Sequence, residues 1–161
     1  MKPDRIVFGI DPGLARCGWA AVNNGSGPVL VAAGCLTTSP RNTESQRLKI
    51  LAGRLRSLIK EYRPDVVALE RLFFAKNSST AMAVGQARGI AVLIAAEAGL
   101  TVCEFAPTAI KLAVAGDGRA DKRQVQKMVM LLLGLKQAPK YDDTVDALAV
   151  ALCGAQTNVL P

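Results

Sequence analysis

Four acidic side chains are spaced so that folding could gather them into one site. Asp11 and Glu70 each end a short apolar run that is typical of a buried β-strand. If these strands are parallel neighbours, their carboxyl ends meet at one edge of the sheet, where ligands bind in open α/β sheets. Asp143 and Asp146 lie three residues apart in a C-terminal helical pattern, so they share one face of that helix.

Each acid also has a simpler structural explanation. Asp11 opens an Asp-Pro-Gly turn, and turn capping alone explains it about as well as a site does. Glu70 on its own would be a solvated strand end, and Asp143 suits the dipole at the start of its helix. Asp146 lies about a turn further in, within an otherwise apolar stretch, where the dipole explains it poorly. The four acids together therefore favour a site.

Such a site would have a definite chemistry. Carboxylates packed together repel and raise one another's pKa unless cations lie between them. Oxygen ligands without histidine or cysteine select hard ions, so Mg²⁺ or Mn²⁺ is expected, with two ions per subunit when substrate is bound. Two such ions about 4 Å apart can activate a water and stabilise the departing oxygen during attack on a phosphodiester.

The composition agrees with a nucleic-acid substrate. The chain of 161 residues carries a formal charge of +7, which suits a polyanionic partner. It contains no histidine, which excludes His-based triads, His metal ligands and the usual neutral-pH general base. A basic protein with a hard-metal carboxylate site is best explained as a nuclease.

Length and cysteine usage predict one domain in a reducing compartment. Residues 1–158 are expected to form a single domain, with a frayed tail at 159–161. The four cysteines are widely spaced without a CxxC pair, so we expect free thiols in the cytoplasm rather than a zinc site. No apolar run is long enough to cross a bilayer, and the N-terminus lacks a signal-peptide plan, so no membrane contact is expected.

Apolar runs that alternate with helical patterns predict an α/β fold. Strands are expected at residues 6–10, 18–22, 29–36, 66–70 and 101–105. Helices are expected between 43 and 63, and over about 78–100, 107–114, 121–132 and 142–152. In the second helix, Gly85 and Gly89 would be explained by close approach of another backbone. Packing on the sheet is the simpler interpretation, and a homodimer interface is the second.

Two basic segments lie near the acids in the chain. The loop after Glu70 contains Phe73, Phe74 and Lys76. Either both aromatic rings are packed, or one belongs to the core and the other is available to wedge into or stack on bases. A glycine-rich loop at 115–120 is flanked or occupied by basic residues, which suits contact with phosphates: Lys111, Arg119, Lys122 and Arg123.

Four segments carry a resemblance to a known family. They are GIDPGLARCGWA (9–20), ALERLFFAKNSSTAMAVGQARG (68–89), DKRQVQKMV (121–129) and DDTVDALAVAL (142–152). In this order and spacing they resemble the RuvC family, the bacterial Holliday-junction resolvases of the ribonuclease H-like superfamily. The resemblance implies a ribonuclease H-like α/β fold, a mixed five-stranded sheet with helices on both faces, and a homodimer.

The resemblance also implies an activity and partners. The activity is resolution of four-way DNA junctions by paired nicks in strands of like polarity, leaving 5′-phosphate and 3′-hydroxyl ends, in recombination and repair. The partners are junction DNA and the branch-migration proteins RuvA and RuvB.

Residue by residue, the family's metal-binding acids match Asp11, Glu70, Asp143 and Asp146. Its junction-wedging aromatic matches Phe73, and its basic residues near the scissile phosphate match Lys111 and Lys122. Asp142 is an open alternative to Asp143, although the three-residue spacing to Asp146 favours Asp143.

Three other classes of protein fit this sequence less well. An actin-like ATPase or sugar kinase can begin with a similar hairpin, but it needs a second related domain and glycine-rich nucleotide loops that this chain lacks. A module that binds branched DNA without cutting it would be helped by losing these acids. A related nuclease of the same superfamily that acts on other structured nucleic acid is the runner-up.

Overall fold

The strand β1 (Ile6–Asp11) lies at the centre of a mixed five-stranded sheet. The computed structural model describes residues 4–72 and 78–157, and their strand order is β3-β2-β1-β4-β5. β2 (Arg16–Asn24) is antiparallel to β1, and β3 (Pro28–Thr37) is antiparallel to β2. β4 (Val66–Glu70) and β5 (Thr101–Phe105) extend the sheet in parallel on the other side of β1. The predicted fold class is confirmed.

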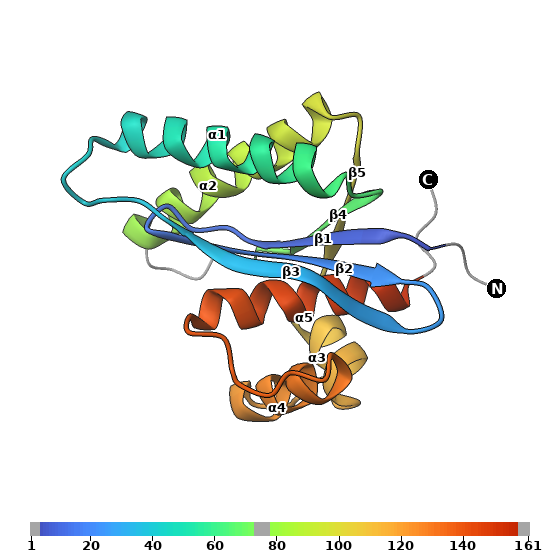
Figure 1. Cartoon of the computed structure of the whole chain (residues 1–161). Coiled ribbons are helices and arrows are strands. Elements are labelled where there is room, and N and C mark those ends of the chain that lie inside the picture. Colours follow the sequence, from blue (N-terminus) through green and yellow to red (C-terminus); the bar gives the residue numbers. More distant parts are fainter. Residues whose placement is uncertain (1–3, 73–77, 158–161) are drawn as a thin grey trace.

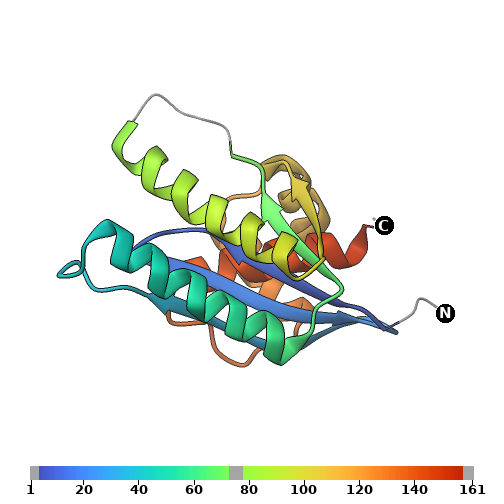
Figure 2. The same cartoon turned by 90° about the horizontal axis from the view of Figure 1, so that it is seen from above.

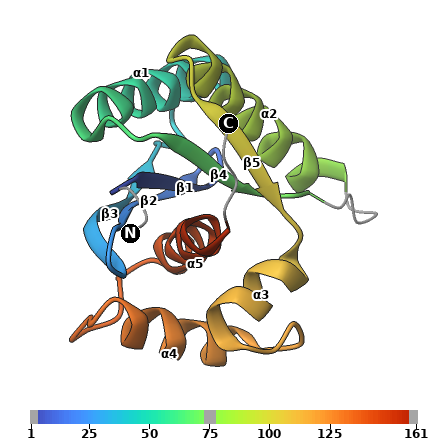
Figure 3. The ribbon, with the colours of Figure 1, turned by 90° about the vertical axis from the view of Figure 1, so that its right-hand side faces the viewer.

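The helices of the described residues cover both faces of this sheet. α1 (Glu44–Tyr62) and α2 (Ser78–Glu97) lie on one face, and α5 (Asp142–Gln156) lies along the other (Figure 1). From above, α1 and α2 lie side by side over the strands (Figure 2). α3 (Pro107–Ala115) and α4 (Lys122–Leu132) lie on the far side of α5 from the sheet (Figure 3).

Each face of the sheet has its own hydrophobic core, because successive residues of a strand point to opposite faces. Val7 packs in the core beneath α3, α4 and α5, while its neighbour Phe8 packs in the core beneath α1 and α2. Leu148 and Leu152 of α5 are fully buried. The carboxylates of α5 are therefore carried by a helix whose opposite side is fixed in the core.

Two glycines let α5 approach the sheet closely. A Cβ atom on Gly9 of β1 would overlap the carbonyl oxygen of Ala147, and one on Gly18 of β2 would overlap that of Asp143. Any larger residue at these positions must push the helix away from the strands. Glycine at 18 thus sets how near the start of α5 comes to the sheet.

The starts of α1 and α4 are fixed by local sequence. Thr43 and Gln46 form a capping box at α1, and Asp121 and Gln124 form one at α4. The predicted cap at Asp121 is confirmed. It places Lys122 in the first turn of α4, directly after the glycine-rich loop.

The glycines of α2 are not explained by packing on the sheet, as the simpler interpretation of the sequence expected. The helix does pack on the sheet, through Ala87, Ala91, Ile94 and Ala95. However, a Cβ atom on Gly85 or Gly89 would meet nothing within 4 Å among the described residues, so packing within the chain does not explain these glycines. On the same helix Met82 is 68% exposed and Leu93 is 50% exposed, although both are large and apolar.

Other differences from the expected elements are small. β2 begins at Arg16 instead of Gly18, because Arg16 and Cys17 already pair with Thr37 and Leu36 of β3. The expected end of the domain at residue 158 and the tail at 159–161 lie outside the described residues. No described helix is both long enough and apolar enough to cross a bilayer.

Candidate active site

Asp11 and Glu70 end neighbouring parallel strands. Ile10 of β1 is in register with Leu69 of β4, and the two acids are the next residues along each strand. Both side chains are partly buried. The condition set in the sequence analysis is therefore met: the two strands are parallel neighbours and bring these acids to one edge.

α5 brings two more carboxylates to the same edge. Its N-terminal turn lies against β2, since the backbone of Asp143 fills the space that a side chain at Gly18 would need. The pKa of Asp11 is raised to about 7, first by burial and then by the charges of Asp146, Asp143 and Glu70, in that order of strength. Asp11 therefore experiences the other three carboxylates directly.

The pKa values of two other acids move in the same direction. Burial is the main cause at Glu70 and Asp146, and it raises both pKa values. The charge of Asp146 raises the pKa of Glu70 further, and the charge of Asp143 raises that of Asp146. Acids whose pKa values are raised by burial and by one another are typical of a functional site.

Two lysines lie beside these acids in one cleft. A cavity of about 240 Å³ is lined by Glu70 and Asp146, by Lys111 and Lys122, and by apolar residues of α3, α4 and α5. The positive charge of Lys111 lowers the pKa of Glu70, and that of Lys122 lowers the pKa values of Asp11 and Asp146. The structure thus brings together acids and lysines that are far apart in the sequence.

The two neighbouring acids at the start of α5 have different surroundings. The carboxylate of Asp142 is 71% exposed and pairs with Lys122, whose Nζ lies 3.0 Å from its Oδ2. The carboxylate of Asp143 is only 24% exposed, and its Oδ2 lies 3.3 Å from Nε of Arg16. Asp143 is also the acid of the two whose charge raises the pKa of Asp11. This favours Asp143 over Asp142 as the member of the acidic cluster.

Sequence reasoning missed Arg16. It opens β2, its guanidinium lies 5.8 Å from the ring centre of Tyr141, and it meets Asp143 across the gap between the sheet and α5. Nothing in the spacing of a single arginine after the first turn predicts this contact. The ion pair between Arg16 and Asp143 depends on the close approach of α5 to Gly18, which is visible only in the folded structure.

The donor set fits a hard divalent ion. Asp11, Glu70, Asp143 and Asp146 offer oxygen only, and their mutual repulsion is relieved when a cation lies among them. As they stand, no three acidic or cysteine side chains of residues 4–72 and 78–157 are close enough to form a finished coordination shell. The structure therefore supports the chemistry of such a site without giving its coordination geometry.

The structure describes only some of the predicted DNA-contacting residues. Phe73, Phe74 and Lys76 lie outside the described residues. Arg119, Lys122 and Arg123 are exposed around the start of α4, and the backbone N–H of Arg119 donates to Oδ1 of Asp117. Of these three, Lys122 also lines the acidic cleft.

Known proteins share this sequence and this fold. Residues 7–154 match the family model described as crossover junction endodeoxyribonuclease RuvC. The chain is 52% identical over 152 residues to the crossover junction endodeoxyribonuclease RuvC of Chloroflexus aggregans, covering 94% of this chain and 93% of that protein. It is 51% identical over 148 residues to that of a Roseiflexus species, covering 91% and 88%.

Solved structures agree. The fold matches Thermus thermophilus RuvC in complex with a Holliday-junction substrate with a TM-score of 0.88 and 37% identity, covering 94% of this chain and 93% of that one. The yeast mitochondrial Holliday-junction resolvase Ydc2 shares the fold alone, with a TM-score of 0.66 and 14% identity over 92% of this chain and 77% of that one.

The strand order and the acids at the edge of β1 and β4 define a ribonuclease H-like protein. Within that class, the match to the family model and the identity to its members are decisive. The chain belongs to the RuvC family of crossover junction endodeoxyribonucleases.

Proposed function

We propose that this chain resolves four-way DNA junctions by making paired nicks in strands of like polarity. The products would carry 5′-phosphate and 3′-hydroxyl ends, and the reaction would serve recombination and repair. One observation carries the proposal. A chain that is 52% identical to a crossover junction endodeoxyribonuclease keeps a cluster of mutually repelling acids at the carboxyl edge of its central strands.

The acids are proposed to hold the metal. Asp11, Glu70, Asp143 and Asp146 would bind Mg²⁺ or Mn²⁺, with two ions per subunit when DNA is bound. The chemistry that such ions supply when bound is activation of water and stabilisation of the departing oxygen. The protein's own contribution is to hold these carboxylates together at one partly buried edge of the sheet, where burial and the neighbouring negative charges raise the pKa values of Asp11, Glu70 and Asp146.

Lys111 and Lys122 are proposed to contact the scissile phosphate. Both line the cleft that contains Glu70 and Asp146, so a phosphate placed there meets an ammonium group from α3 and another from α4. Lysine binds phosphate as a point charge and stabilises negative charge that develops during the reaction. Lys122 would exchange its present partner, Asp142, for the phosphate.

The remaining DNA contacts are proposed from charge and resemblance. Arg119 and Arg123 are exposed beside Lys122, in a chain with a formal charge of +7, and they would bind the backbone of a junction arm. Phe73 or Phe74 would wedge into the junction, with Lys76 contacting phosphate. The loop that carries them leaves β4 after Glu70 and enters α2, so it begins at the acidic edge of the sheet.

Two subunits and further proteins complete the proposal. A homodimer would present two active sites to two strands of one junction, and the exposed apolar side chains of Met82 and Leu93 on α2 support an interface there. RuvA and RuvB are proposed partners by family resemblance. The cysteines at 17, 35, 103 and 153 are free thiols, in agreement with a site of action in the cytoplasm.

A comparison of substrates tests the proposal. The purified protein is given equal amounts of a four-way junction, a linear duplex of the same sequence and an RNA–DNA hybrid, each with Mg²⁺ and with EDTA. We expect cleavage of the junction alone, at symmetric positions in two opposing strands, and none in EDTA. Equal cleavage of the linear duplex or the hybrid would instead make the chain a nuclease of the same superfamily with another substrate.

A further inference from the structure

A second concave surface lies along the outer side of α4. It is a groove of about 640 Å³, and its lining residues recur at helical spacing: Arg123, Gln126, Lys127, Met130, Leu131, Gly134 and Leu135. We call it the α4 groove. It shares no lining residue with the acidic cleft, whose contribution from α4 comes from Lys122 and Val125.

The helix is held in the fold mainly by residues outside the α4 groove, and of the groove's apolar residues only Leu135 is partly buried against the core. Val125 and Val129 are buried and attach the inner side of α4 to the core, where Met128 and Leu132 also pack. Leu131 lies on the opposite side and is 70% exposed. Leu131 is thus a large apolar side chain open to solvent within the groove, on a helix that other residues already anchor.

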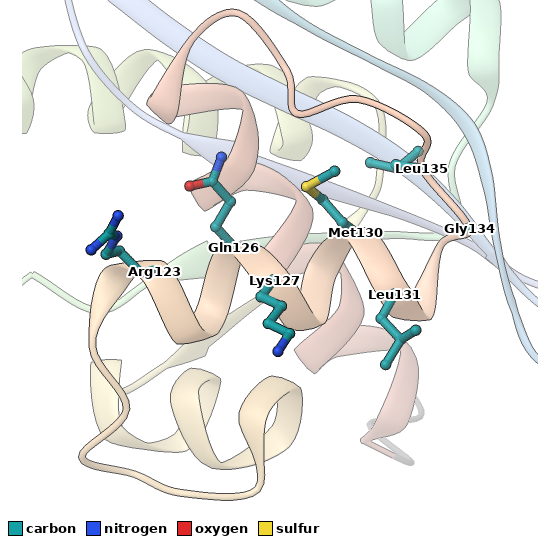
Figure 4. Close-up of a pocket in the computed structure, with 7 residues that line it drawn as sticks. All are labelled: Arg123, Gln126, Lys127, Met130, Leu131, Gly134 and Leu135. Atoms are coloured by element: carbon teal, nitrogen blue, oxygen red, sulfur yellow. The ribbon is translucent and has the colours of Figure 1, made fainter.

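The end of α4 shapes the groove. Gly134 has a φ of 61°, a left-handed conformation that turns the chain back, and the N–H of Leu135 then donates to the carbonyl of Met130. Figure 4 shows Met130, Leu131 and Leu135 gathered at this end of the helix, with Arg123, Gln126 and Lys127 toward its start. The groove therefore has an apolar end and a basic end.

The charges specify the occupant. None of the lining residues is acidic, and within residues 4–72 and 78–157 neither Arg123 nor Lys127 forms an ion pair. Lys136 follows Leu135 in the chain and is exposed. An occupant that satisfies the groove must offer carboxylates to one end and large apolar side chains to the other.

Those requirements fit a protein segment better than DNA. Duplex DNA meets proteins with phosphates and base edges, and an apolar surface of leucine and methionine gives it nothing to pair with. Single strands stack on aromatic rings, and no aromatic residue lines the groove. An amphipathic helix, with apolar residues three or four apart and acidic residues beside them, matches both ends.

We propose that the α4 groove docks an acidic, amphipathic helical segment of a partner protein. The segment would place two large apolar side chains against Met130, Leu131 and Leu135, and a carboxylate against Lys127. Because α4 also carries Lys122 into the acidic cleft, a partner bound here lies beside the cleavage site without occupying it.

Peptide selection tests the proposal. A displayed library of random 16-residue peptides is selected on the full chain, and the affinities of the recovered peptides are measured by fluorescence anisotropy. We expect acidic peptides with two large apolar residues three or four positions apart. Their affinity should fall about tenfold or more for Leu131→Glu and for Lys127→Glu, since hot-spot contacts cost this much when removed.

Matched controls make the outcome decisive. Lys49→Glu changes the charge equally on the exposed surface of α1, and it should leave peptide binding unchanged. Circular dichroism melting checks that each variant is folded. Recovery of no peptides, of peptides without this pattern, or of peptides that bind Leu131→Glu as well as wild type would overturn the proposal. The proposal would also be overturned if a 20-base-pair DNA duplex displaced the peptides and if Leu131→Glu abolished binding of that duplex. The groove would then be a DNA contact.

Discussion

Asp11 and Glu70 are the next residues after a pair in parallel register, Ile10 of β1 with Leu69 of β4. Two carboxylates are thereby fixed at one edge of the sheet by the strand pairing itself. α5 adds Asp143 and Asp146 to that edge, and burial with the resulting repulsion raises the pKa of Asp11 to about 7. The ionisation of acids held in this arrangement lowers the free energy of unfolding, and the first two predictions concern this loss of stability.

The stability of the metal-free protein should fall as the pH rises. The pKa of Asp11 is about 7 in the folded state against an ordinary value of 3.8. Between these values the folded protein keeps the proton and the unfolded chain has lost it, so folding is favoured at the acid end of this range. Urea denaturation in EDTA should therefore give a free energy of unfolding that declines from about pH 4 to about pH 7. Above about pH 7 the contribution of Asp11 to this decline should end.

Asp11→Asn is the matched control for that decline. The amide cannot ionise, so the difference in stability between wild type and variant should grow in favour of the variant as the pH rises through the same range. Curves for the two proteins that stay parallel from about pH 4 to about pH 8 would show that Asp11 ionises normally.

Asp146→Asn should separate binding from cutting. The variant keeps the shape of the side chain and the surrounding basic residues, so it should still retard a four-way junction in a gel. Cleavage with Mg²⁺ should fall by at least about 100-fold, as expected for loss of a metal-site residue. Since the pKa of Asp146 is raised by burial, the metal-free variant should melt no lower than wild type. Cutting at the wild-type rate would remove Asp146 from the mechanism.

Asp142→Asn and Asp143→Asn should differ sharply. Asp142 is mostly exposed and pairs with Lys122, whereas Asp143 is largely buried and acts on the pKa of Asp11. We expect Asp143→Asn to lose cleavage as Asp146→Asn does, and Asp142→Asn to keep it within a few-fold. Junction cleavage under single-turnover conditions measures both, and the reverse order of effects would make Asp142 the ligand.

Gly18→Ala should damage the site through the fold. The added methyl group would overlap the carbonyl oxygen of Asp143, so the start of α5 must move away from β2. Overpacking of this kind costs about 1–3 kcal/mol of stability. Cleavage should fall as well, because the shift displaces the Asp143 carboxylate. Gly53→Ala is the control, since a Cβ there meets nothing within 4 Å among the described residues.

Much of this architecture could be predicted from residue patterns. Apolar runs that end in Asp11 and Glu70, and the capping signal at Asp121, are local features, and local features identify strands and helix starts well. The parallel pairing of β1 with β4 was expected only as a condition. It follows from the crossover through α1, which carries the chain from β3 at one edge of the sheet to β4 on the other side of β1.

Other features depend on contacts between distant segments. The ion pair between Arg16 and Asp143 exists because α5 lies against β2, and no spacing in the sequence encodes that distance. The same holds for the α4 groove, which needs the reversal at Gly134 to bring Leu135 back toward Met130. For Gly85 and Gly89 the interpretation as packing on the sheet was wrong for a related reason, since a Cβ atom there would meet nothing within 4 Å in the described part of this chain. The alternative, a homodimer interface, stays a prediction.

The most direct measurement of the central claim is the position of the metal. Crystals of the protein are soaked in Mn²⁺ and its anomalous scattering is recorded at the manganese edge. We expect scattering peaks within about 2 Å of carboxylate oxygens of Asp11, Glu70, Asp143 or Asp146, and none at this edge in Asp146→Asn crystals treated in the same way. Peaks only at other acids, such as Asp117 and Asp121, or peaks unchanged by the substitution, would contradict the account.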